Sequence, residues 1–400
     1  MPKGSIQRLR SGLAAVCLVL LVVGFGFKVA ADCSTFGLPF SDLGATQFCA
    51  EIAEAYYTGL TRGTSATTYA PTATVNRAQM AAFVTRTLDQ SLLRGSRRAA
   101  LDQWWTTTPH YDAPLGLTTV GIGPVLLKSD GADVWVANGS DWTVSRVRAR
   151  DGKLLDTWTG ATDANGVLVA AGRVFVTGQS SPGKLYAIDP TAAAGAVTTV
   201  ASALGNVPIG IAFDGNKIWT SNGLGSVSII TPGTTIPWAV TTVSTGFDQL
   251  VGILFDGANI WVTDGAANTL LKLTPDGSIA QTVALGNEPL FPAFDGHNIW
   301  VPNFAGNSLS VVRASDGVVL KTFSAANGDQ NGLSSPIQAA FDGQRVLVTN
   351  VHGGLSLFRA TDLSVIGSVA TSGVSTPYGV CSDGVDFWVS FSGSSAIGRF

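Results

Sequence analysis

The sequence is poor in histidine, methionine and charge. Its 400 residues include 3 His and 2 Met, and only 13% are Asp, Glu, Lys or Arg. The chain contains no HExxH, no G-x-S-x-G and no phosphate-binding loop, so it lacks the short motifs of zinc peptidases, serine hydrolases and nucleotide-binding enzymes. Glycine is abundant, at 47 residues, beside many Thr and Val, a composition that favours strands and tight turns over helices.

The first 31 residues have the pattern of an export signal. Three cations, the last of them Arg10, precede an uncharged apolar run at 12–27, and Ala31 ends a small-residue cleavage pattern. The run is shorter than the roughly 20 residues of a membrane span, which favours cleavage over an uncleaved membrane anchor. We therefore expect an exported protein, either in the cell envelope at the cell surface or secreted.

Export changes both the charge and the expected chemistry of cysteine. Without the signal, 20 of the 24 cations remain against 27 acids, a formal charge of −7, which disfavours nucleic-acid binding because that needs a basic face. Cys33 and Cys49 lie in one short region of an exported chain, so we expect a disulfide between them. Cys381 is then unpaired and is expected to be a small buried hydrophobe.

Residues 32–108 are expected to form a small helical module. Asn76 and Gln79 have the spacing of a capping box, and Met80, Phe83 and Val84 recur at helical spacing after it. The module resembles the S-layer homology module over residues 40–88. The residues that carry this resemblance are Phe40, Asp42, Gly59, Leu60, Thr61, Gly63, Tyr69, Pro71 and the helix start VNRAQMAAFVTRTL.

The resemblance implies a role for Arg77. In that family the Arg of the helix start contacts anionic cell-wall polysaccharide, so the implied partner is a cell-wall polysaccharide or a peptidoglycan-linked polymer. The alternative is that Arg77 is a solvated residue of the first helical turn. Asn76 and Gln79 replace the Thr and Glu of the family pattern. The chain also has one copy of the module, so its binding to wall polymer would lack the avidity of several linked copies.

After a linker at 109–116, residues 117–400 repeat one pattern. FDGNKIWTSN begins at 213, FDGANIWVTD at 255, FDGHNIWVPN at 294 and FDGQRVLVTN at 341. The turn positions are spaced 39 to 47 residues apart, close to the roughly 40–45-residue period of four-stranded propeller blades. Those positions are Asp130, Ala171 in a degenerate copy, Asp214, Asp256, Asp295, Asp342 and Asp383.

These repeats predict a mainly β protein, a seven-bladed β-propeller behind the helical module. The last repeat ends after its third strand, and the segment 115–122 is expected to complete that blade. The repeats resemble those of exported YVTN propellers and of NHL and streptogramin-lyase-type propellers, a likeness that implies the fold rather than an activity. The aromatic positions are expected to pack one blade on the next instead of forming a sugar-binding stripe. They are Trp135, Phe175, Trp219, Trp261, Trp300 and Trp388, with Leu347 in one blade.

Two kinds of turn are expected to share one rim of the propeller channel. Asp248, Gln249, Glu288 and Tyr378 belong to the turns before the inner strands. The turns after the second strands begin at Asn138, Asn222, Asp264, Asn303 and Asn350. Such a funnel would hold a polar small molecule or a divalent cation with oxygen ligands. The alternative is that these Asn and Asp side chains cap turns.

The leading hypothesis is a non-enzymatic, exported envelope protein whose module binds wall polymer and whose propeller rim binds an unknown ligand or partner. The alternative is a metal-assisted lyase or lactonase-like hydrolase that uses His352 with Glu288 or Asp264, although no catalytic motif is matched. A third hypothesis is a scaffold with a protein partner on a flat propeller face. No cofactor is expected other than a divalent cation at the rim.

Overall fold

The structure is a computed structural model, and it divides the chain into two compact units, residues 1–90 and 91–400. The expected boundary at 109–116 lies almost wholly outside the described residues, as do Cys33, Cys49 and the apolar run at 12–27. Within the described part of the chain, no helix is long and apolar enough to cross a membrane. The described residues are 31–32, 38–43, 45–46, 52, 61, 63–65, 67–77, 79–81, 83–84, 116–324, 331–352, 354–371 and 376–400.

The first unit has a small apolar core. Phe40, Leu43 and Ile52 are buried, and Leu38 and Tyr69 pack against them. The ring centroids of Phe40 and Tyr69 are 5.4 Å apart. Two short strands, β1 and β2, pair antiparallel in the same unit, at Ala31–Asp32 and Ala45–Thr46.

Asp42 holds the loop that precedes the helix of this unit through hydrogen bonds to its backbone. Its carboxylate accepts the backbone N–H of Tyr69 at 2.8 Å and that of Ala70 at 2.7 Å, and these two bonds lower the pKa of Asp42. Gly63 has a φ of +77°, and a Cβ there would lie 2.5 Å from Phe40 Cε1. The motif residues Phe40, Asp42, Gly63 and Tyr69 therefore hold one another in place.

The predicted capping box is present. The N–H of Gln79 donates to Asn76 Oδ1, and the N–H of Asn76 donates to Gln79 Oε1, both at 2.9 Å. Helical backbone follows at 77, 79–81 and 83–84. Met80 and Val84, which recur at helical spacing, are 53% and 62% exposed, so this unit's core does not cover them.

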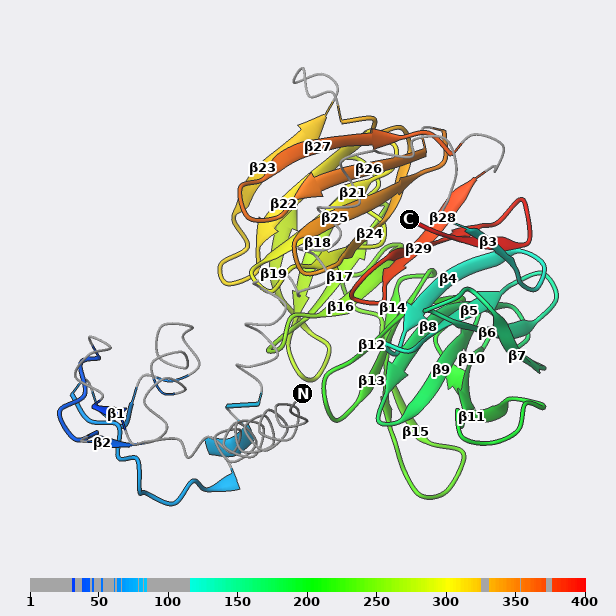
Figure 1. Cartoon of the computed structure of the whole chain (residues 1–400). Helices are drawn as coiled ribbons and strands as arrows, with labels where there is room; N and C mark the ends of the chain where they lie inside the picture. Colours follow the sequence, from blue (N-terminus) through cyan, green and yellow to red (C-terminus); the bar gives the residue numbers. More distant parts are fainter. Residues whose placement is uncertain are drawn as a thin grey trace, which may run out of the picture. The chain divides into compact units, whose positions relative to one another are not determined.

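The second unit is a seven-bladed propeller, as predicted (Figure 1). Its described residues form seven four-stranded antiparallel sheets, six of them built from consecutive strands. The strands of blades 1 to 3 are β4 (Pro124–Ser129), β5 (Asp133–Asn138), β6 (Thr143–Arg148), β7 (Leu154–Thr159), β8 (Ala164–Ala170), β9 (Arg173–Gly178), β10 (Gly183–Ile188), β11 (Thr198–Leu204), β12 (Pro208–Phe213), β13 (Ile218–Asn222), β14 (Ser226–Thr231) and β15 (Ala239–Val243). Those of blades 4 to 6 are β16 (Leu250–Phe255), β17 (Ile260–Asp264), β18 (Thr269–Leu273), β19 (Ile279–Ala284), β20 (Ala293–Phe294), β21 (Asn298–Asn303), β22 (Ser308–Arg313), β23 (Val319–Ser324), β24 (Pro336–Phe341), β25 (Arg345–Asn350), β26 (Gly354–Arg359) and β27 (Ser364–Val369).

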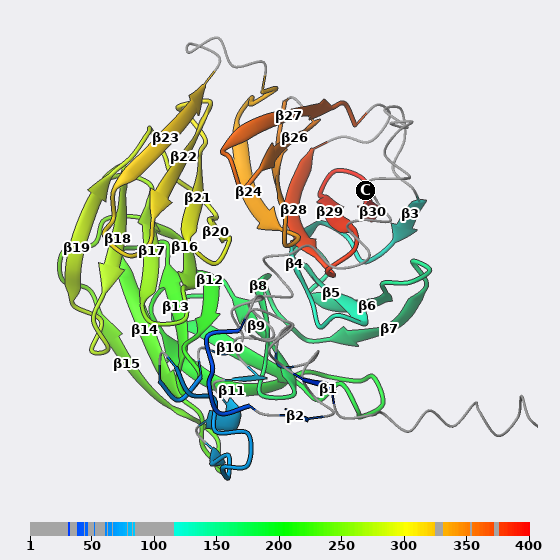
Figure 2. The same cartoon turned by 60° about the vertical axis from the view of Figure 1, so that its left-hand side comes forward.

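Blade 7 closes the ring with strands from both ends of the propeller. It contains β28 (Pro377–Ser382), β29 (Phe387–Phe391), β30 (Ala396–Arg399) and, as its outer strand, β3 (Gly116–Thr119). β3 pairs antiparallel with β30, from Gly116 opposite Arg399 to Thr119 opposite Ala396. Figure 2 shows β3 beside β30 at the junction of the ring. The closure expected from segment 115–122 is therefore confirmed.

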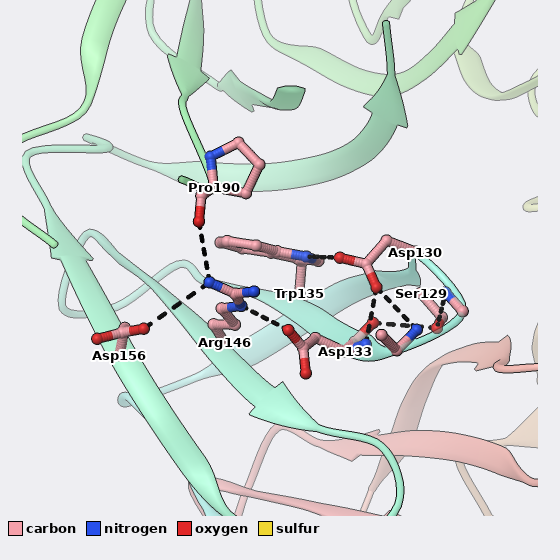
Figure 3. Close-up of polar contacts among 9 residues, drawn as sticks. Ser129, Asp130, Asp133, Trp135, Arg146, Asp156 and Pro190 are labelled. Carbon is pink, nitrogen blue, oxygen red and sulfur yellow. Dashed lines mark hydrogen bonds and ion pairs between the residues drawn. The ribbon is translucent and has the colours of Figure 1, made fainter. Parts of the chain in front are cut away.

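The Asp-Gly turn that joins the first two strands of a blade also fixes the tryptophan that follows it (Figure 3). In blade 1, Asp130 Oδ1 accepts the N–H of Ala132 at 2.9 Å and that of Asp133 at 2.7 Å. Asp130 Oδ2 accepts Trp135 Nε1 at 2.9 Å. Gly131 has a φ of +91°, a backbone conformation that favours glycine. One aspartate thus closes the turn and pairs a buried indole N–H.

The same bond recurs wherever both partners are present. The Trp–Asp distance is 2.7–2.9 Å in five blades, for Asp130 and Trp135, Asp214 and Trp219, Asp256 and Trp261, Asp295 and Trp300, and Asp383 and Trp388. In blade 6, the side chain of Leu347 has no N–H to donate, and Arg345 Nε donates to Asp342 Oδ2 instead, at 2.7 Å. In blade 2, Ala171 replaces the acceptor and Phe175 replaces the donor.

The aromatic residues pack between blades, as predicted. Trp135 is fully buried in a cluster with Val174 and Val176 of the next blade. Trp388 of blade 7 packs with Leu127 and Val134 of blade 1, which completes the ring of cores. These side chains are therefore unavailable to a sugar.

Side-chain hydroxyls also join neighbouring blades near the channel. Thr263 Oγ1 of β17 accepts the N–H of Gly252 at 2.8 Å and donates to the carbonyl of Leu290 in the next blade at 2.7 Å. The same position makes the same pair of contacts in five blades. The hydroxyls belong to Thr177, Ser221, Thr263, Thr349 and Ser390.

Candidate functional site

A cavity of about 360 Å³ lies where the inner strands of the propeller converge. Its wall comes from blades 2 to 7, and each blade contributes through the same few repeat positions. The lining residues are Asn165, Gln179, Ile209, Gln249, Val251, Gly265, Glu288, Leu290, Phe291, Phe304, Ile337, Val351 and Tyr378.

In three blades the second residue of the inner strand forms the apolar part of the wall. Ile209, Val251 and Ile337 hold this position in blades 3, 4 and 6. Buried Leu126 and Phe291 pack with them in one cluster. Two blades differ at the second position, because blade 2 has Asn165 and blade 7 has Tyr378.

These two exceptions are polar groups in an apolar surrounding. Asn165 is 7% exposed, and its buried Oδ1 has no hydrogen-bond partner in the part of the chain that the structure describes. Tyr378 packs against Phe291, with ring centroids 6.5 Å apart. Burial raises the pKa of Tyr378, so its phenol stays neutral at physiological pH.

Glu288 is positioned in the cavity wall by backbone contacts. It precedes the inner segment of blade 5 with a φ of +58°, which is uncommon for a residue with a side chain. Its N–H donates to Asn268 Oδ1 at 2.7 Å, and its carbonyl accepts the N–H of Phe304 at 2.8 Å. This backbone contact therefore holds Glu288 and Phe304 next to each other in the cavity wall.

The structure corrects the predicted ring of turn amides. Four amides and one carboxylate, all at most 1% exposed, lie inside the blades and not on the rim: Asn138, Asn222, Asp264, Asn303 and Asn350. Asn222 Nδ2, for example, donates to Ser226 Oγ at 3.1 Å and to Ser228 Oγ at 3.0 Å. Their repetition reflects the capping of turns, which was the alternative interpretation.

The three residues of the enzyme alternative are not brought together. The carboxylate of Asp264 accepts the N–H groups of Asp248, Gln249 and Ala267 at 2.8–3.1 Å, so it acts as a turn cap. His352 is exposed and its Nδ1 is 3.2 Å from Ser335 Oγ, outside the cavity wall. Among the described residues, only Glu288 of the three lines the cavity.

The divalent cation stays a prediction. Over the described ranges, no three His, Cys, Asp or Glu side chains gather as a metal site requires. Cys381 is buried and unpaired, as expected, and burial raises its pKa to about 12, which keeps the thiol protonated at neutral pH.

The cavity wall includes residues from the predicted turns after the second strands, but they are the neighbours of the recurring Asn and Asp side chains. Gln179, Gly265, Phe304 and Val351 line the cavity, and each of them ends the second strand or immediately follows it. That position varies from blade to blade, whereas the Asn or Asp beside it recurs. Variation within an otherwise regular repeat was the available signal, because only the backbone N–H of this position is needed for the turn, and its side chain is free to serve a ligand.

Comparisons with known proteins agree with both units. Residues 39–81 match the family model of the S-layer homology domain. A search of curated proteins gives no match. Among solved structures, the chain is similar to selenomethionine-substituted virginiamycin B lyase from Staphylococcus aureus, at 16% identity and a TM-score of 0.53, over 71% of this chain and 98% of that chain.

Two further structures show the same fold. A catalytically inactive virginiamycin B lyase from Staphylococcus aureus, solved with quinupristin, has 16% identity and a TM-score of 0.59 over 71% of this chain and 98% of its own. The WD40 propeller domain of Doa1 has 13% identity and a TM-score of 0.59 over 72% of this chain and 96% of its own. At these identities the similarity shows the propeller fold and no activity.

Proposed function

We propose that the protein is an exported binding protein of the cell envelope. Its S-layer homology domain attaches to an anionic cell-wall polymer, and its propeller presents the central cavity to a ligand. The observation that carries the proposal is Arg77, an exposed guanidinium in the first turn of a capped helix, within the segment that matches the domain family.

The chemistry of this helix start suits an anionic sugar. The first turn of a helix has backbone N–H groups without intrahelical partners and a positive dipole end. Asn76 Oδ1 pairs the N–H of Gln79, and Asp42 holds the preceding loop through Tyr69 and Ala70, so the turn is fixed before any ligand arrives. A guanidinium at this place adds a planar, bidentate donor for carboxylate or phosphate groups.

Co-sedimentation with isolated cell envelopes tests the proposal. The full chain is expected to pellet, and Arg77→Ala is expected to lower its apparent affinity roughly tenfold, because a hydrogen bond to a charged group is lost. Arg77→Lys keeps the positive charge and tests whether the two parallel hydrogen bonds that a guanidinium can donate are needed. Arg150→Ala is the matched control, since Arg150 is 75% exposed on the propeller.

Two results would contradict the proposal. If the chain stays in solution with envelopes, it does not bind the wall. If a chain that begins at residue 109 pellets as well as the full chain, the propeller is the adhesive part and Arg77 is a solvated residue.

A further inference from the structure

The ligand of the central cavity can be specified by chemical class. We propose that the cavity binds a small organic cation, with its ammonium group held by the Glu288 carboxylate and the faces of Phe291, Phe304 and Tyr378. This inference rests on the proposed function in one respect, namely that the propeller binds a ligand at its centre.

The charge of the site favours a cation. Among the described residues that line the cavity, Glu288 is the only charged one. A half-buried carboxylate in a wall of aliphatic and aromatic side chains attracts an opposite charge more strongly than it would in water, because the surrounding dielectric is low. The formal charge of −7 on the exported chain adds a long-range attraction of the same sign.

The aromatic residues favour an organic cation over a metal ion. Three aromatic rings line the same cavity as Glu288. The backbone N–H of Phe304 donates to the Glu288 carbonyl at 2.8 Å. Ammonium groups bind to aromatic faces, where they lose less solvation than an inorganic divalent ion would. Aliphatic Ile209, Val251 and Ile337 supply apolar contact for the body of such a ligand.

Of the three buried amide oxygens without a hydrogen-bond partner among the described residues, in Asn138, Asn165 and Asn303, only that of Asn165 belongs to a residue of the cavity wall. Its amide lies in the wall, almost fully buried, with Oδ1 unpaired. A buried amide oxygen without a partner costs free energy in the empty protein, and a ligand N–H or O–H would relieve that cost. The cavity volume of about 360 Å³ lies within the range of small-molecule sites.

Choline and 3,3-dimethylbutan-1-ol form a matched pair of probes, because they have the same shape and differ in the positive charge. Equilibrium dialysis of the full chain is expected to show choline binding with a Kd of roughly 1 mM or below, and much weaker binding of the neutral alcohol. Glu288→Gln is expected to weaken choline binding roughly fivefold or more, with little effect on the alcohol.

Two variants separate the parts of the site. Phe304→Leu keeps the apolar area and removes an aromatic face, so it should weaken choline more than the alcohol. Asp156→Asn removes a carboxylate on the outer strand β7, where Asp156 is 4.0 Å from Arg146, and should change nothing. The readout is the ratio of the two Kd values, which a general loss of structure would not shift.

Three outcomes overturn the inference: equal affinity for the two probes, no binding of choline at about 10 mM, or unchanged choline affinity in Glu288→Gln. Envelope attachment is measured separately by sedimentation. If the chain pellets with envelopes but does not bind choline, only the cation site is contradicted. If the chain binds choline but does not pellet, only the attachment to the cell wall is contradicted.

Discussion

At the scale of single residues, the turn aspartates do more than shape a turn. Burial alone would raise the pKa of Asp256, but the Trp261 indole N–H and the backbone N–H groups of Asn259 and Ala258 outweigh it and lower the pKa. The same balance lowers the pKa of Asp130 and Asp214. The turn was predictable from its Asp-Gly pair. The bond to tryptophan was not, because an aspartate in the turn and a tryptophan five residues later in the next strand reveal no contact until the blade is formed.

This balance predicts a loss of stability in acid. A carboxyl group whose folded-state pKa is depressed stabilises the fold above its ordinary value of 3.8, and that contribution disappears as the pH falls through the lowered pKa. Asp256→Asn should be less stable than the wild type by about 1–2 kcal/mol at pH 7, because the amide presents a donor to the Trp261 indole. Urea unfolding at several pH values measures the difference in free energy of unfolding between the wild type and the variant, and this difference should shrink below pH 3.8.

Asp362→Asn is the matched control. Asp362 also caps a turn, through the N–H of Ser364, but its side chain is 52% exposed, and its contacts among the described residues are with Ser364 and Arg359 and with no tryptophan. Equal pH dependence in the two variants would show that the indole bond contributes nothing.

At the scale of elements, regular repeat positions fold the blade and irregular ones form the site. The hydroxyl of Thr263 is one of the regular positions, and nothing in the sequence distinguishes it from other strand residues. Its role depends on the neighbouring blade, since one oxygen serves Gly252 of its own sheet and Leu290 of the next. The blade count and strand order were predictable because each blade repeats locally, whereas contacts between blades are set by tertiary packing.

Thr263→Val is expected to destabilise the propeller by about 1–3 kcal/mol, since it leaves a buried N–H and a buried carbonyl unpaired at nearly unchanged volume. Thr282→Val on the exposed side of β19 makes the same chemical change without buried partners. The midpoints of urea unfolding compare the two variants. A shift for Thr263→Val no larger than that for Thr282→Val would argue against the hydroxyl link between blades.

At the scale of the whole molecule, the ring is closed by hydrogen bonds between distant parts of the chain. β3 lies directly after the segment that joins the propeller to the N-terminal unit, and it completes the sheet that ends with β30. This closure was predictable from a missing fourth strand and a spare one. The central cavity was only partly predictable, because Glu288 and Tyr378 lay in the expected turns, while Asn165 and Phe304 become neighbours of the site only when the ring is formed.

Loss of β3 should therefore weaken every blade at once. A chain that begins at residue 120 would expose the edge of β30 and lose the bond from Thr118 Oγ1 to the Gly152 carbonyl, which is 2.6 Å long and ties blade 7 to blade 1. We expect a Tm lower by several degrees and self-association through the open edge, since unpaired strands recruit other chains. A chain that begins at residue 109 keeps β3 and serves as the control in thermal unfolding and gel filtration. Equal Tm and a monomeric elution for both chains would show that the ring holds without its closing strand, and that packing between blades alone keeps the central cavity formed.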